Sequence, residues 1–121
     1  MRRNLSSGSP YEQAVGYSRA VRVGAHIAVA GTTGNGDDVA TQTRDALRRI
    51  EAALREAGAT LRDVVRTRIY VTDISQWRDV GAAHAEVFGD VKPVATMVEV
   101  SALIEPGLLV EIEADAYVPG D

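Results

Sequence analysis

Three carboxylates alternate along a predicted strand near the C-terminus, at Glu111, Glu113 and Asp115. An extended chain directs alternate side chains to opposite faces, so these three share one face while apolar residues occupy the other. A carboxylate whose pKa is raised by burial can take a proton from water as a general base. It can also simply pair across the sheet with Arg66 or Arg68. The sequence leaves both roles open.

A second candidate for chemistry is the glycine-rich stretch 31–36, which also contains Thr32 and Thr33. Its backbone donors and hydroxyls resemble those of a phosphate-binding loop. That loop requires a Lys-Ser or Lys-Thr ending to be specific, and none follows here. We therefore expect a mobile loop at the rim of a cleft.

Other groups restrict the chemistry further. The chain has no cysteine and only two histidines, His26 and His84, which are far apart in sequence. Thiol chemistry is thus excluded, and no metal site is expected. His84 lies on the inner side of a predicted helix, where a hydrogen-bonded, partly buried histidine is expected rather than a catalytic one. Trp77, in the same helix, is expected to pack in the interior.

The composition and charge limit the classes of protein to which the chain can belong. The chain has 121 residues, of which 45% are hydrophobic and 25% charged, and a net charge of −4. These values fit one globular domain spanning residues 1–121, with residues 1–10 as a loose N-terminal arm. The chain has no run dense in Lys and Arg, so we expect no nucleic-acid partner. The sequence shows neither a long apolar run nor a signal-peptide core, so we expect no membrane partner and a cytoplasmic location.

The elements that would position these residues follow a β-β-α-β-α-β-β order. This order predicts an α+β fold, with one mixed sheet and both helices on one face. The other face would carry the acidic side chains and need covering by an oligomer. The expected strands are 17–23, 26–30, 65–71, 93–100 and 110–116, and the expected helices are 39–57 and 76–88.

From residue 16 to residue 116 the chain resembles the Rid family, also called YjgF/YER057c/UK114. The resemblance is carried by Ala30-Gly31, by the helix ending at Ala57-Gly58-Ala59, and by residues 63–73 and 93–116. It implies a chorismate-mutase-like single domain and a homotrimer with clefts between subunits. It also implies hydrolysis of reactive imines and enamines, such as 2-aminoacrylate, to keto acids and ammonia without a metal or cofactor.

The resemblance also assigns site residues. Tyr17, Gly31 and Glu111 fall where the family has pocket residues, and the glutamate at the last position is thought to orient the attacking water. The family arginine that binds the substrate carboxylate corresponds to Ala95, and an asparagine of the active group falls near Gly81. The resemblance therefore predicts altered substrate choice and little or no activity on 2-aminoacrylate.

The missing arginine raises the question of a replacement. Arg19 would share a strand face with Tyr17 and is one candidate, although a solvated or salt-bridged strand arginine is the plainer expectation. The predicted site is then an intersubunit small-molecule pocket, with Glu111 catalytic and Arg19 and His84 auxiliary. A non-catalytic binding or regulatory trimer is the main alternative, and a ribonuclease is a weaker one. The residues expected to bind substrate are Tyr17, Gly31, Thr32, Ala95 and Thr96.

Overall fold

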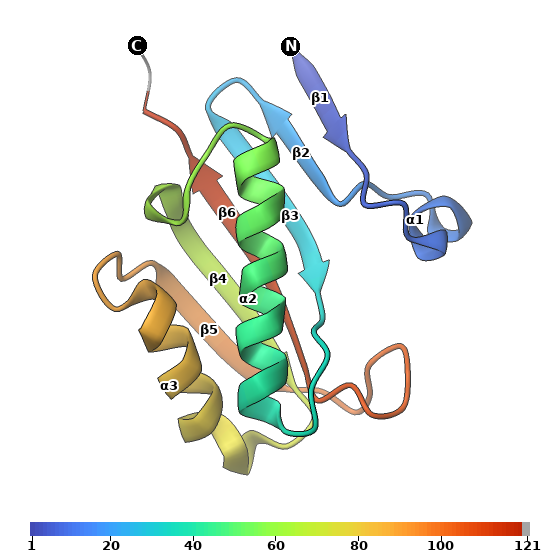
Figure 1. Cartoon of the computed structure of the whole chain (residues 1–121), viewed down its shortest axis with the longest axis vertical. Helices are drawn as coiled ribbons and strands as arrows, with labels where there is room; N and C mark the ends of the chain where they lie inside the picture. The colour runs from blue at the N-terminus through green and yellow to red at the C-terminus, as the bar shows by residue number, and fades with distance from the viewer. Residues whose placement is uncertain (120–121) are drawn as a thin grey trace.

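The chain folds as a six-stranded mixed sheet with two long helices, α2 and α3, on one face (Figure 1). The computed structural model describes residues 1–119. Strand order is β1-β2-β3-β6-β4-β5, and only the β4–β5 pair is parallel. The predicted α+β class is confirmed. The elements are β1 (Arg2–Leu5), α1 (Pro10–Val15), β2 (Ala20–Val23), β3 (His26–Thr32), α2 (Val39–Glu56), η1 (Leu61–Asp63), β4 (Val64–Val71), η2 (Ile74–Gln76), α3 (Trp77–Phe88), β5 (Val94–Glu99) and β6 (Val110–Tyr117).

Helix α2 lies across the sheet and supplies most of the core on that face. It begins at the N-cap Asp38, whose carboxylate accepts the Thr41 N–H at 2.8 Å. It ends before Gly58, whose φ of +90° suits a residue without a side chain. Its buried stripe, which includes Leu47 and Ile50, packs on β3 and β6. Each such side chain contributes roughly 1.5–3 kcal/mol when fully buried.

The N-terminal segment is ordered, so the expectation of a loose arm over residues 1–10 was wrong. Strand β1 pairs antiparallel with β2, with Leu5 opposite Ala20. The next segment is held by Glu12, which is buried and accepts the Ser6 hydroxyl at 2.8 Å and the Ser7 N–H at 3.1 Å. Backbone pairing at a sheet edge needs no apolar pattern, and for this reason the sequence did not reveal it.

Two further expectations differ in detail. The strand expected at residues 17–23 begins at Ala20, because helix α1 ends at Gly16 and leaves Tyr17 in the following turn. Trp77, expected in the interior, is 48% exposed and stacks with Arg78. Trp77 begins α3, and the core is filled from later turns of that helix by Val80, Ala83 and Phe88.

Candidate functional site

A cleft of about 820 Å³ opens between α2, the N-terminal segment and the loop that follows β5. Its walls come from segments that are distant in sequence, which the fold brings to one end of β3. Four of the residues predicted for the site line it, namely Tyr17, Arg19, Gly31 and Glu111, together with several that were not predicted. Gly31 contributes backbone to the lining. The polar and charged side chains that line the cleft are those of Ser6, Ser7, Ser9, Tyr11, Tyr17, Arg19, Thr33, Asn35, Arg49, Glu56, Glu105 and Glu111.

Glu111 is half-buried in this cleft, against the backbone of Gly31. A Cβ built on Gly31 would lie 2.7 Å from Oε2 of Glu111, so only glycine leaves room for the carboxylate. Burial raises the pKa of Glu111 above its usual value, and the nearby Glu113 adds to the rise while Arg19 opposes it. Glu111 makes no ion pair or hydrogen bond through its side chain among residues 1–119. A carboxylate in this state can accept a proton from a bound water.

The other two carboxylates of the alternating set are used within the sheet. On β4, Arg68 lies 3.4 Å from Glu113 and 3.4 Å from Asp115, and the Tyr70 hydroxyl donates to Glu113 at 2.9 Å. That hydrogen bond to Glu113 is the main reason that the pKa of Tyr70 is raised. The pairing role left open from the sequence therefore applies to Glu113 and Asp115 but not to Glu111.

Arg19 is fixed at the same end of β3. Its Nη2 donates to the carbonyl of Gly31 at 2.6 Å, and its guanidinium lies 6.0 Å from the ring centroid of Tyr17. Its Nε is buried and has no hydrogen-bond partner within the described chain. The expectation of a solvated or salt-bridged strand arginine was thus wrong, because Arg19 turns toward the cleft.

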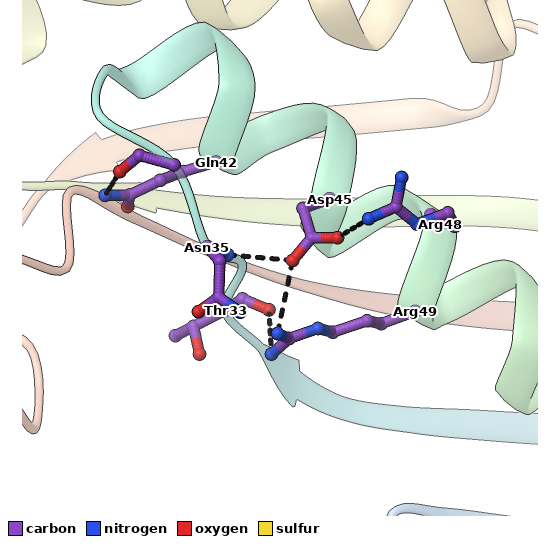
Figure 2. Close-up of polar contacts among 7 residues, drawn as sticks. Thr33, Asn35, Gln42, Asp45, Arg48 and Arg49 are labelled. Atoms are coloured by element: carbon purple, nitrogen blue, oxygen red, sulfur yellow. Dashed lines mark hydrogen bonds and ion pairs between the residues drawn. The ribbon is translucent and has the colours of Figure 1, made fainter.

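The loop between β3 and α2 is held by a polar network that the sequence analysis missed (Figure 2). Asp45 on α2 accepts the backbone N–H of Asn35 at 2.8 Å, which is the largest reason that the pKa of this carboxyl is lowered. Arg49 lies 3.2 Å from Oδ2 of Asp45 and donates to the carbonyl of Thr33 at 3.1 Å, while Arg48 bonds the other oxygen. The i,i+4 spacing of Asp45 and Arg49 was the available signal.

Gln42, one turn earlier on α2, joins this loop to the one after β5. Its side-chain amide donates to the carbonyl of Gly36 at 3.1 Å and to that of Gly107 at 2.9 Å, and its carbonyl accepts the Leu109 N–H at 2.8 Å. The first of these bonds is drawn in Figure 2. Both loops that border the cleft are therefore anchored on α2. The expectation of a mobile rim loop was wrong, because side chains of α2 bond its backbone at Thr33, Asn35 and Gly36.

Across the mouth of the cleft, the Tyr11 hydroxyl on α1 donates to the carboxylate of Glu105. This hydrogen bond raises the pKa of Tyr11 and connects α1 to the turn at Glu105-Pro106-Gly107.

The remaining predicted residues lie elsewhere. Thr32 is buried, and its hydroxyl donates to the carbonyl of Ala30 at 2.8 Å. Ala95 and Thr96 are exposed on the edge strand β5, which β4 separates from β6. His84 lies 3.0 Å from the hydroxyl of Thr67, and burial lowers its pKa. One copy of the chain thus brings together Tyr17, Arg19, Gly31 and Glu111, but none of these four others.

Residues 1–119 contain neither a cluster of metal ligands nor a helix that could span a membrane. No group of three or more His, Cys, Asp or Glu side chains is placed to hold a metal ion in this part of the chain. None of its helices combines the length and the apolar character needed to cross a membrane.

A family model, related sequences and solved structures all match this chain over most of its length. Residues 7–118 match the family described as Endoribonuclease L-PSP. A RutC family protein from Pyrococcus abyssi is 39% identical over 109 residues, covering 84% of this chain and 85% of that protein. The crystal structure of a YjgF/YER057c/UK114 family member from Mycobacterium tuberculosis is 73% identical, with a TM-score of 0.96 over 98% of this chain and 100% of that chain. A Rid protein family member from Yersinia pestis is 31% identical, with a TM-score of 0.84 over 98% and 100%.

Proposed function

The chain belongs to the Endoribonuclease L-PSP family, which includes the YjgF and Rid proteins, and on this premise we propose that it hydrolyses an imine or enamine metabolite in a cleft shared between the subunits of a homotrimer. The observation that carries the proposal is the state of Glu111, which is half-buried in the cleft with a raised pKa and no ion pair. A cytoplasmic location and the absence of a cofactor are further predictions of the same proposal.

The proposed reaction needs only a positioned water and a base. An iminium carbon is already electrophilic, so water held beside Glu111 attacks it while the carboxylate takes one proton from that water. A carbon–oxygen bond forms, and the nitrogen becomes an amine. Glu111 then returns its proton to that nitrogen, and the carbon–nitrogen bond breaks as the new hydroxyl gives its own proton to Glu111. A carbonyl compound and ammonia leave, and the ammonia takes up this last proton as ammonium. Tyr17 and Gly31 border this position, and Arg19 holds the Gly31 carbonyl in place.

We predict that the protein in solution is a trimer. The support is the edge strand β5, which exposes Val94 and Val98, and the open sheet face next to it. A neighbouring copy would bury these side chains and could bring Ala95 and Thr96 to the cleft. Light scattering at micromolar concentration should give three times the mass of the chain. A monomer mass under these conditions would contradict the shared cleft, although not the chemistry of Glu111.

We also predict weak or absent hydrolysis of 2-aminoacrylate. Ala95 offers neither charge nor hydrogen-bond donor, whereas an arginine binds a small carboxylate through two charge-assisted hydrogen bonds. Because Ala95 is exposed on β5, Ala95→Arg should fold normally and gain activity on this substrate. Ammonia release from enzymatically generated 2-aminoacrylate, with both proteins, measures the difference. Rapid hydrolysis of 2-aminoacrylate by the natural protein would show that Ala95 does not limit activity on this substrate.

The second candidate is a non-catalytic binding trimer, which Ala95 also favours. A screen of imines generated in situ by amino-acid oxidases, with and without the protein, separates the two. Faster ammonia release on any imine supports hydrolysis, and binding without acceleration supports the second candidate. Ribonuclease activity is less favoured, because the chain has a net charge of −4 and no Lys/Arg-dense run to bind a phosphate backbone.

A further inference from the structure

The cleft contains a second immobilised guanidinium group, that of Arg49, which the proposed chemistry does not use. Its Nη1 is bonded to the carbonyl of Thr33 at 3.1 Å and its Nη2 lies 3.2 Å from Asp45 (Figure 2). The side chain is nevertheless 45% exposed and lines the cleft. Two acceptors therefore fix the plane of the guanidinium while part of it stays open to a ligand.

This cluster carries an excess of positive charge. Asp45, whose side chain is only 10% exposed, is shared by two arginines, so one negative charge is set against two positive ones. Arg48 is 76% exposed and does not line the cleft, so the group presented to a ligand is Arg49. Glu56 and Glu105 also line the cleft, and Tyr11 donates to the second of these. Recognition at Arg49 therefore depends on direct hydrogen bonding rather than on the net field.

The two cleft arginines are held at different points of one short segment. Arg19 bonds the carbonyl of Gly31, and Arg49 bonds that of Thr33, two residues further along. In a nearly extended chain, two residues span about 7 Å. Glu111 packs against Gly31, at the Arg19 end of this segment. A ligand with two anionic groups can thus meet one guanidinium beside the proposed reacting centre and the other further along the cleft.

We propose that Arg49 binds a second anionic group of the ligand, so that the cleft takes imino acids with an acidic side chain in preference to monocarboxylates. Arg19 meets the carboxylate next to the imine carbon, and Asp45 is a positioning residue that holds Arg49. The substrate class rests on the proposed hydrolysis, whereas the preference for dianionic ligands does not. The same preference explains why a small monoanion such as 2-aminoacrylate is expected to be a poor substrate.

The test is a binding measurement on the intact protein with two product-like keto acids. 2-Oxoglutarate carries two carboxylates, and 2-oxopentanoate has the same chain length with one. Isothermal titration calorimetry should show tighter binding of the first, and Arg49→Met should reduce its affinity on the order of 10- to 100-fold, which is typical for loss of a hydrogen-bonded charge. Affinity for 2-oxopentanoate should change little.

Arg48→Met is the matched control, because it removes the other partner of Asp45 without altering the cleft lining. It should keep the preference for 2-oxoglutarate. Arg49→Lys serves if the methionine variant does not fold, and it should show a reduced preference because an ammonium lacks the planar fork. Equal affinity of the natural protein for both keto acids, no binding of either, or an equal loss in Arg48→Met would overturn the proposal. A retained preference in a protein that hydrolyses no imine would overturn only the proposed function.

Discussion

Replacing Glu111 by glutamine is expected to remove most of the imine turnover while the protein keeps its fold and its trimer. The amide has nearly the same shape but cannot accept a proton as a carboxylate does. Loss of a positioned base typically costs about 10²- to 10⁴-fold in rate. Because Glu111 makes no ion pair among residues 1–119, its neutral replacement should not weaken the sheet. Turnover and sedimentation measured on the same sample test both parts of this expectation.

Glu113→Gln is the comparison variant, since its carboxylate pairs with Arg68 and Tyr70 instead of facing the cleft unpaired. Glu113→Gln should lower the melting temperature and leave the turnover nearly unchanged. The pH profile gives a second check. A base works when deprotonated, and the pKa of Glu111 is raised, so activity should fall on the acidic side at a pH above the usual range of a glutamate. Full activity in Glu111→Gln would leave this side chain with an architectural role only.

Gly31→Ala is expected to cost about 10²-fold in turnover with little loss of stability. The added Cβ would lie 2.7 Å from Oε2 of Glu111 and 2.9 Å from its Cδ, so the carboxylate must move. The obstructing atoms belong to the end of a flexible side chain, so relief is cheap for the fold. Displacement of a catalytic group by about 1 Å is enough to produce a rate loss of this size. Steady-state kinetics and thermal denaturation of the variant measure the two effects separately.

The double variant Gly31→Ala with Glu111→Gln provides the internal control. If alanine acts by displacing the carboxylate, it should cause almost no further loss of turnover once Glu111 is already glutamine. The effects of substitutions at two residues in contact are not additive. A further loss of the same size in the double variant would mean that Gly31 acts independently of Glu111. A large drop in melting temperature in the single variant would show instead that strand β3 itself had been disturbed.

Periodic patterns allowed most of the fold to be predicted. The three- and four-residue spacing along α2 and the alternation along β4 and β6 identify these elements, because a buried face requires apolar side chains at the period of its backbone. The motifs at 63–73 and 93–116 supported the family resemblance, which the comparisons confirm. Strand β1 and helix α1 were missed, since hydrogen bonds to β2 and around Glu12 hold them rather than an apolar stripe.

The sequence by itself determined that three carboxylates share one sheet face, but only the tertiary structure distinguished among them. Along β6 the three are equivalent, and their difference comes from the neighbouring strands. Arg68 on β4 pairs with Glu113 and Asp115, while Glu111 lies against Gly31 on β3, where no side chain fills the space. Strand order depends on long-range pairing, which the local pattern of one strand does not encode. For the same reason, only the fold could place Arg19 and Arg49 in one cleft with Glu111.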